Sequence, residues 1–317
     1  MPRIALCLSD VARCLWPRAV APYNGGGPPY PGPRPLLPDR MTDPISTERA
    51  QAHAALLPAL RATIREAAAL ALPHFCAGGQ TTARVWSKAG GSPVTEADVA
   101  VDTFLKVRLS EIEPRAAWLS EETVDDALRL NSDLVWIVDP IDGTRAFLSG
   151  HPDWSISVAL LDRGVPVLGF VHAPTLDRFY EAAVGLGARC NGERIGTSQR
   201  TTLDGAGVTG PKPLYDRLER GAAKGGSARF TRIDRVPSLA LRVARVAEGA
   251  IDVGLVSRDS RDWDLAGADL ILREAGGTVC DPDGTPTVYN RPEPRHGELV
   301  AVSRSLRDAA IAALKVA

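Results

Sequence analysis

The chain has 317 residues, of which 44% are hydrophobic and 24% are charged, and its formal net charge is −1 at pH 7. This composition is typical of a globular protein with a substantial core, and the balanced charge argues against a nucleic-acid polymer or an anionic membrane as partner. No run of the sequence approaches the ~18 apolar residues of a membrane helix. The five cysteines are scattered without metal-ligand spacing, which predicts free thiols and a cytoplasmic location.

The first forty residues differ from the rest of the chain. Prolines and glycines cluster between Gly25 and Pro38, a composition that does not support a packed core. We therefore expect a disordered extension over residues 1–40. Met1 and Met41 are the two methionines of the chain, and the globular pattern begins just after the second. Our hypothesis is that Met41 is the natural start, which the intact mass of the protein made from its native gene would test.

Beyond Met41, an Ala- and Leu-rich pattern predicts a long helix from Thr47 to Phe75, with an interruption at Pro58. Next, the segment SPVTEAD places Thr95 and Asp98 at the spacing of a capping box. The helix that this box would begin has its apolar positions at Val101, Phe104, Leu105 and Leu109.

Acidic residues follow two short apolar runs. Glu121 and Glu122 come after the first run, within WLSEET, and about twenty residues later the run from Leu134 to Val138 leads into the sequence DPIDGT. The second run predicts a buried strand that ends where Pro140 removes a ladder hydrogen bond.

The two aspartates of DPIDGT flank a proline-stiffened bend. Asp139 and Asp142 can therefore converge on one point, and Gly143 permits a backbone that a Cβ would disfavour. Two such carboxylates repel each other unless a cation lies between them, which indicates a Mg²⁺ site. The alternative is that both dipeptides only form turns. A helix that begins near Thr144 would also present free N–H groups to a phosphate.

The rest of the chain alternates strands and helices. Asp162, Arg163 and Gly164 predict a hairpin between strands Ser155–Leu161 and Val165–His172. The remaining predicted strands are 179–183, 188–190, 193–195, 208–209 and 251–256, and the predicted helices are 239–248 and 265–275. Asp264 opens the last of these helices, so its alternative role is that of an N-cap.

Four of these segments, in this order and at these separations, resemble the inositol monophosphatase family of Mg²⁺-dependent, lithium-sensitive phosphatases: SPVTEAD, SEET, DPIDGT and WDLAGAD. The resemblance runs from about Ala54 to the end of the chain. It implies an α/β fold, a layered αβαβα sandwich, with an N-terminal α+β half (41–184) and a C-terminal α/β half (185–317). The metals would lie in a cleft between the halves, and a homodimer is plausible.

The resemblance also implies roles for individual residues, with two or three Mg²⁺ ions in the site. One metal would be held by Glu121, Asp139 and the carbonyl of Ile141, and a second by Asp139, Asp142 and Asp264. Asp98 and Thr144 would form the pair that orients and deprotonates the attacking water, which is held near Glu121. The substrate phosphate would contact Asp142, Gly143, Thr144 and Asp264.

The expected substrate is a small phosphate ester, and the sequence defines its identity less well than it defines the metal ligands. In the inositol-specific members a glutamate precedes the motif aspartate by seven residues, and here that position is Ser257. Ser238 falls where the family's pocket wall lies and would touch the sugar. Cations that could receive a second anionic group, or could equally be surface charges, are Lys212, Arg258, Arg261, Arg291 and Arg295.

The flanking sequences VWSKAGGSPVTEADVAVD and YNRPEPRHGELVA are also similar to bacterial phosphatases of 3'-phosphoadenosine 5'-phosphate. We therefore rank this nucleotide first, inositol monophosphate second and histidinol phosphate third. The alternative outside the enzymes is a module that binds a phosphate ligand without hydrolysing it. Such a module would not need the water-activating pair.

Overall fold

The computed structural model describes residues 45–88, 91–224 and 229–315. The expected extension over 1–40 and the proposed start at Met41 fall outside the described residues. Within the described residues, seven strands form one sheet in the spatial order β3 (Ala117–Ser120), β4 (Leu134–Asp142), β5 (Ser155–Asp162), β6 (Val165–Ala173), β7 (Arg178–Ala183), β8 (Ala188–Cys190) and β9 (Glu193–Arg194).

A second, five-stranded sheet lies in the C-terminal part of the described chain. Its spatial order is β11 (Thr231–Arg232), β10 (Gly207–Thr209), β12 (Val253–Val256), β14 (Leu299–Ser303) and β13 (Gly277–Cys280). A small antiparallel pair, β1 (Val85–Ser87) and β2 (Pro93–Thr95), precedes the first sheet in the chain.

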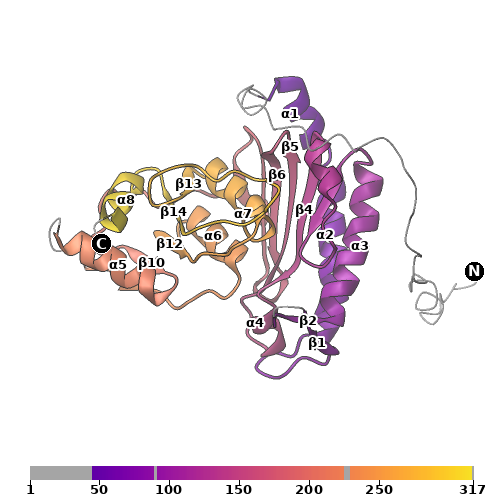
Figure 1. The fold of residues 1–317 in the computed structure, drawn as a ribbon, viewed down its shortest axis with the longest axis horizontal. Coiled ribbons are helices and arrows are strands. Elements are labelled where there is room, and N and C mark those ends of the chain that lie inside the picture. The colour runs from indigo at the N-terminus through magenta and orange to yellow at the C-terminus, as the bar shows by residue number, and fades with distance from the viewer. Residues whose placement is uncertain (1–44, 89–90, 225–228, 316–317) are drawn as a thin grey trace, which may run out of the picture. The chain divides into compact units, whose positions relative to one another are not determined.

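Helices separate and cover the two sheets, and Figure 1 shows the resulting layers. The first sheet carries α2 (Leu57–Ala71) and α3 (Glu96–Ile112) on one face and α6 (Leu239–Ala247) and α7 (Asp262–Glu274) on the other. Beyond the second sheet lie α5 (Lys212–Lys224) and α8 (Arg307–Lys315). The shorter helices are α1 (Thr47–Ala54), α4 (Thr144–Leu148) and the 3-10 turns η3 (Leu72–His74), η4 (Ala127–Asn131) and η5 (Pro174–Leu176). The predicted α/β layered sandwich is confirmed.

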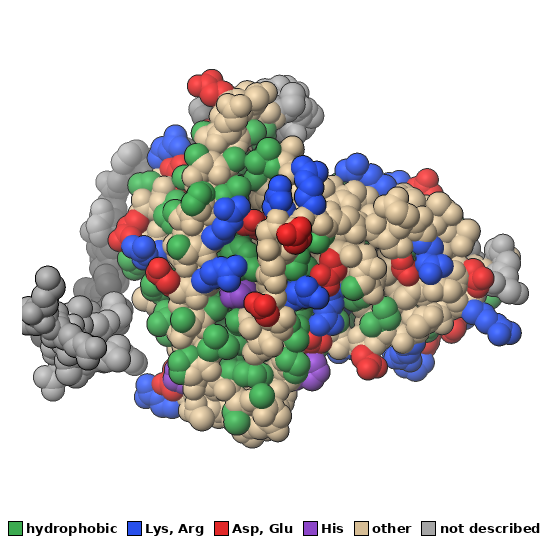
Figure 2. All heavy atoms as spheres, turned by 180° about the vertical axis from the view of Figure 1, so that it is seen from behind, with side chains coloured by type: hydrophobic (Ala, Val, Ile, Leu, Met, Phe, Trp, Pro, Cys, Tyr) green, Lys and Arg blue, Asp and Glu red, His purple; other side chains and the backbone are tan. Residues whose placement is uncertain are grey.

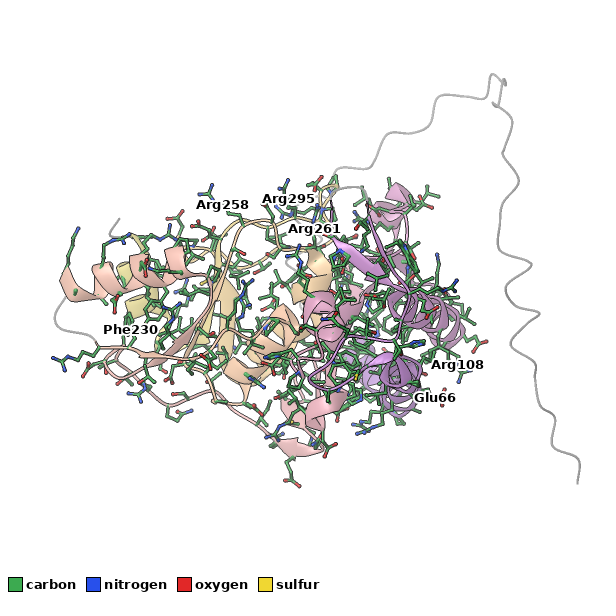
Figure 3. The ribbon with its side chains drawn as sticks, turned by 90° about the horizontal axis from the view of Figure 1, so that it is seen from below. Glu66, Arg108, Phe230, Arg258, Arg261 and Arg295 are labelled. Atoms are coloured by element: carbon green, nitrogen blue, oxygen red, sulfur yellow. The ribbon has the colours of Figure 1, made fainter. Side chains whose placement is uncertain are left out.

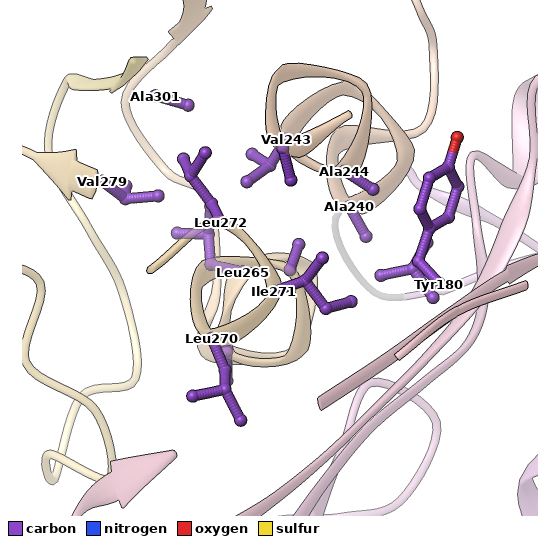
Figure 4. Close-up of a cluster of buried hydrophobic side chains, with 14 of the residues drawn as sticks. Tyr180, Ala240, Val243, Ala244, Leu265, Leu270, Ile271, Leu272, Val279 and Ala301 are labelled. Carbon is purple, nitrogen blue, oxygen red and sulfur yellow. The ribbon is translucent and has the colours of Figure 1, made fainter. Parts of the chain in front are cut away.

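Two hydrophobic cores explain this layering. On the outer face of the first sheet, Leu60 and Leu105 of α2 and α3 pack with Trp136 of β4. On the inner face, α6 and α7 form the middle layer of a second core that reaches both sheets, as Figure 4 shows around Leu265 and Ile271. Every residue of β4 is buried, since helices cover both faces of its sheet. The first sheet therefore presents β4 to the middle layer as a rigid, buried support.

Several element boundaries differ from the predictions. The helix expected over 47–75 is divided into α1 and α2 at Ala55 and Leu56, so that Pro58 lies in the first turn of α2, where its missing N–H is tolerated. The prediction that the strand ends at Pro140 is wrong. β4 continues to Asp142 because its pairing with β5 is irregular between Asp139 and Asp142 and then resumes opposite Ser155.

The other strand predictions are confirmed within a few residues. The hairpin between β5 and β6 turns through Arg163 and Gly164, which both have positive φ angles, as a two-residue hairpin loop requires. The division of the chain near residue 185 stays a prediction. β8 and β9 follow that point but still belong to the first sheet, since β8 pairs with β7 and β9 pairs with β8.

The contact between α7 and the first sheet is unusually close. An ideal Cβ built on Gly169 of β6 would lie 2.4 Å from the carbonyl oxygen of Gly267 in α7. A Cβ on Gly267 would in turn lie 2.8 Å from the carbonyl oxygen of Val158 in β5. Two glycines thus let the backbone of α7 rest directly on the sheet, and the first turn of this helix is thereby fixed close to the end of β4.

The surface of the described part of the chain is mixed in character. Figure 2 shows basic and acidic side chains interspersed on one face, among scattered exposed hydrophobic ones. Among the described residues, none of the helices has the length and apolar character that crossing a membrane requires.

Candidate metal and phosphate site

The end of β4 places two aspartates in a buried position. Asp139 and Asp142 are 1% and 6% exposed, and the irregular pairing with β5 lies between them. Gly143 follows with a φ of 90°, and α4 begins at Thr144, as predicted. A Cβ at Gly143 would lie 3.2 Å from the carbonyl oxygen of Asp153, so both the φ angle and the space favour glycine.

A third aspartate joins them from α7. Asp139, Asp142 and Asp264 each offer one carboxylate oxygen, and these oxygens all lie within 4.8 Å of one another. Asp264 does not act as the N-cap: Arg261 occupies that position, the helix begins at Asp262, and Asp264 is the third helical residue. Its Oδ2 accepts a hydrogen bond from the Arg261 backbone N–H at 2.7 Å. The three aspartates come from two segments more than a hundred residues apart in the sequence.

Each of these carboxylates is held by the protein through one oxygen. Asp142 Oδ2 accepts hydrogen bonds from the Ser238 hydroxyl at 2.6 Å and from the Ala240 N–H at 2.7 Å, both at the start of α6. Asp139 Oδ1 accepts one from the Ile141 N–H at 3.1 Å. One oxygen fixes each orientation, which leaves the other available for a ligand.

The electrostatics of the cluster are unfavourable without a cation. Burial, followed by the charges of Glu121, Asp142 and Asp264, raises the pKa of Asp139 well above its usual value. Burial and the charge of Asp142 do the same for Asp264. Burial raises the pKa of Asp142 to about 6, although its hydrogen bonds from Ser238 and Ala240 oppose the shift. Within the described residues, no Lys, Arg or His forms an ion pair with these aspartates. The all-oxygen donor set fits a hard divalent ion such as Mg²⁺.

Glu121 lies at the edge of this cluster and has a cationic partner. The Lys88 ammonium is 2.9 Å from Glu121 Oε1 and 2.7 Å from Glu122 Oε1. Burial opposes the charged form of Lys88, but the two glutamates together raise its pKa. Burial also raises the pKa of Glu122 to about 7. The carboxylate of Glu121 is close enough to perturb Asp139, yet it is not one of the three that converge within 4.8 Å.

Asp98 and Thr144 lie together, as the sequence predicts. The Thr144 hydroxyl is 3.1 Å from the carbonyl oxygen of Ile141 and 3.4 Å from Asp98 Oδ1. Asp98 Oδ2 closes the predicted capping box by accepting hydrogen bonds from the N–H and hydroxyl of Thr95, at 2.8 and 2.5 Å. Burial raises the pKa of Asp98 to about 6 against these hydrogen bonds. A carboxylate with this pKa can exchange a proton near neutral pH.

The two serines of the predicted pocket lie in different environments. Ser238 is fully buried and caps α6, and its hydroxyl contacts Asp142, Ser155 and the N–H of Leu241. It supports a carboxylate of the cluster. Ser257 is exposed just after β12. The substrate contacts expected of both residues stay predictions.

Two features of this site were missed from the sequence. The ion pairs of Lys88 with the two glutamates join residues more than thirty positions apart in the sequence. The only local feature that could have indicated them is a single lysine shortly before two glycines in the sequence SKAGG. The contact of Ser157 with the carbonyl oxygen of Trp263, at 3.1 Å, ties α7 to the strand that faces Asp139. No local pattern marks that contact.

Comparisons with known proteins agree with this geometry. Residues 54–315 match the inositol monophosphatase family. A histidinol-phosphatase of Mycobacterium tuberculosis is 34% identical over 241 residues, which cover 73% of this chain and 87% of the relative. A 3'(2'),5'-bisphosphate nucleotidase of Haemophilus influenzae is 30% identical over 227 residues, covering 68% of this chain and 81% of the relative.

Solved structures show the same fold. The IMPase of Thermotoga maritima matches with a TM-score of 0.67 and 29% identity, covering 80% of this chain and 93% of that one. The extragenic suppressor protein suhB of Bartonella henselae matches with a TM-score of 0.70 and 27% identity, covering 82% and 98%. The chain therefore belongs to the inositol monophosphatase family and is a phosphoric monoester hydrolase.

Proposed function

We propose that this chain hydrolyses a small phosphate monoester with Mg²⁺ and an activated water. The observation that carries the proposal is the convergence of the buried Asp139 and Asp142 with the half-buried Asp264, all three without a basic partner among the described residues. Mg²⁺ held by these carboxylates, by Glu121 and by the carbonyl of Ile141 would neutralise the phosphate oxygens and lower the pKa of a bound water. Two or three ions per site is our expectation.

The chain's own residues orient and deprotonate the water in this proposal. The Thr144 hydroxyl holds it in line with the ester bond, and Asp98, which lies 3.4 Å from that hydroxyl, receives the proton. The phosphate rests on the N–H groups of Gly143 and Thr144. No side chain caps α4, so the donors of its first turn are not used by a cap.

Our leading candidate substrate is 3'-phosphoadenosine 5'-phosphate, which carries a second phosphate. Four of the five cations that were considered for that group are in ion pairs with carboxylates: Lys212, Arg258, Arg261 and Arg295. The last three lie along one edge of the molecule in Figure 3. Arg291 is different, since it forms no ion pair with a described residue and its buried Nε has no hydrogen-bond partner. Arg291 is therefore our candidate for the second phosphate.

Histidinol phosphate also stays a candidate, because one relative at 34% identity is named as a histidinol-phosphatase. Inositol monophosphate is supported by the family and by other relatives, but Ser257 stands where the inositol-specific members have a glutamate. We keep a homodimer and a cytoplasmic location as expectations.

A side-by-side measurement of kcat/KM on the three substrates tests the proposal. Efficient release of inorganic phosphate from the nucleotide, lowered in Arg291→Gln through KM, would support our leading candidate. A preference for histidinol phosphate or for inositol monophosphate would replace it. If well-folded protein hydrolysed none of a broad panel of phosphate monoesters in Mg²⁺, the binding-module alternative would hold. The Asp139→Asn variant is the control for contaminating phosphatase.

A further inference from the structure

A buried polar network lies beside the proposed metal site and takes no part in the chemistry above. Arg129 of η4 forms a two-point ion pair with Asp125, with N···O distances of 2.6 and 2.8 Å. Its Nη1 donates to Asn290 Oδ1 at 2.7 Å, and its Nη2 donates to the carbonyl of Arg291 at 3.1 Å. Arg129 is 1% exposed, although arginine is seldom fully buried.

The network continues into the first turn of α7. The backbone N–H of Asn290 donates to Asp262 Oδ2 at 2.7 Å, and His296 Nε2 lies 2.7 Å from Asp262 Oδ1. Asp262 is fully buried, and both of its oxygens are engaged. It is the first residue of α7 and stands two positions before Asp264. The segment 289–296 is thus fastened to the start of the helix.

The two ends of the network lie on the elements that carry two of the proposed metal ligands. Arg129 lies on the segment that leaves β3 through Glu121, and the other end holds the helix that carries Asp264. These two proposed ligands come from elements far apart in the sequence. Buried charges that are fully hydrogen-bonded form a stiff connection, and breaking one link leaves an uncompensated charge.

We infer that Arg129, Asn290, Asp262 and His296 form a positioning network that sets the separation between the carboxylates of Glu121 and Asp264, and thereby the affinity of the site for its cation. This inference rests on the proposed Mg²⁺ site. None of the four residues touches the substrate or the metal in this scheme, so they are positioning residues rather than catalytic ones.

The chain offers a matched pair of variants. Asn290 has a φ of 56° and Asn191, in the turn between β8 and β9, has a φ of 50°. Both side chains join loops through hydrogen bonds, Asn191 to Phe179 and Asp177. Glycine tolerates this backbone, so Asn290→Gly and Asn191→Gly each remove a loop-bridging side chain without adding strain.

The experiment is a calorimetric titration of the whole protein with Mg²⁺ at fixed pH. We expect Asn290→Gly to raise the Kd for Mg²⁺ by about 10–100-fold, and Asn191→Gly to leave it unchanged. Phosphate release from the best substrate should distinguish the two variants in the same way. The kcat of Asn290→Gly recovers when the Mg²⁺ concentration is raised, because its metal ligands are intact. A merely structural role would lower the unfolding midpoint without changing Mg²⁺ affinity.

Wild-type affinity in Asn290→Gly would overturn the inference while leaving the metal site standing. Failure of the wild-type protein to bind Mg²⁺ would overturn the proposed function and the inference with it. If Asn290→Gly does not fold, Arg129→Lys decides in its place, since lysine keeps the charge but cannot hold Asp125 and Asn290 together. Its control is Arg61→Lys, which breaks the two-point ion pair between Arg61 of α2 and Glu181 of β7. Equal Mg²⁺ affinities in these two lysine variants would refute the network's role.

Discussion

The close packing of α7 on the first sheet leads to a quantitative prediction for Gly169→Ala. The new Cβ would lie 2.4 Å from the carbonyl oxygen of Gly267, whereas ordinary contacts begin at 3.4 Å. Strand and helix must therefore separate by about 1 Å, because the obstacle is backbone and has no rotamer to change. Overpacking of this kind costs about 1–3 kcal/mol of unfolding free energy.

The same displacement should reach the active site. Asp264 stands on the helix that must move, while Asp139 and Asp142 stand on β4. A misplacement of about 1 Å can cost on the order of 100-fold in rate. We expect Gly169→Ala to lose both stability, measured by urea unfolding, and kcat, measured as phosphate release at saturating Mg²⁺.

Gly297→Ala is the control for this substitution. No atom lies within 4 Å of the Cβ built on Gly297, and its φ is not in the positive range. It should keep wild-type stability and rate. If Gly169→Ala unfolds earlier but turns over at the wild-type rate, the position of α7 does not control the site. If it is unchanged in both, the strand and the helix accommodate the added methyl group without separating.

Three further predictions concern single side chains. Asp142→Asn and Asp264→Asn should each lower kcat by orders of magnitude without lowering the unfolding midpoint in chelator, because each removes a repelling charge; wild-type turnover in either would refute the metal assignment. Ser238→Ala removes the cap of α6 and a hydrogen bond to Asp142, and should cost about 0.5–2 kcal/mol in urea unfolding together with a weaker Mg²⁺ affinity; loss of stability alone would limit Ser238 to capping. Burial disfavours the charged form of Asp162, but His53 and nearby arginines hold the pKa of this carboxyl below its usual value. The ionised Asp162 therefore stabilises the folded protein at pH values above the unfolded pKa of about 3.9. This contribution to the unfolding free energy is lost as pH falls through the lower folded pKa. Asp162→Asn should therefore flatten the acid limb of a stability-versus-pH curve, and an unchanged limb would contradict this reasoning.

Features that depend on neighbouring residues were predictable from the sequence. The capping box of Thr95 and Asp98, the start of α4 after Gly143, and the hairpin at Arg163 and Gly164 follow from turn and cap chemistry within a few positions. Local chemistry was sufficient in these places because no distant contact competes with it. The convergence of Asp139, Asp142 and Asp264 was expected from the family resemblance instead, and Glu121, which the resemblance also implied as a ligand, is not among the three carboxylates that converge.

Other features depend on contacts that no short segment contains. The extension of β4 past Pro140 depends on its pairing with Ser155. The start of α7 at Asp262 rather than Asp264 depends on the burial of Asp262 against Asn290 and His296. Two aspartates in the sequence RDWD are equivalent as caps until the tertiary structure distinguishes between them.

The central position of α7 has a consequence for attempts to engineer this protein. One helix contributes both to the hydrophobic interior and to the reactive centre, so substitutions that adjust its fit will alter turnover and folding together. A library aimed at new substrates would retain more folded members if diversity were confined to exposed positions outside this helix. Ser257 and Arg258, on the loop that follows β12, are the natural places to begin.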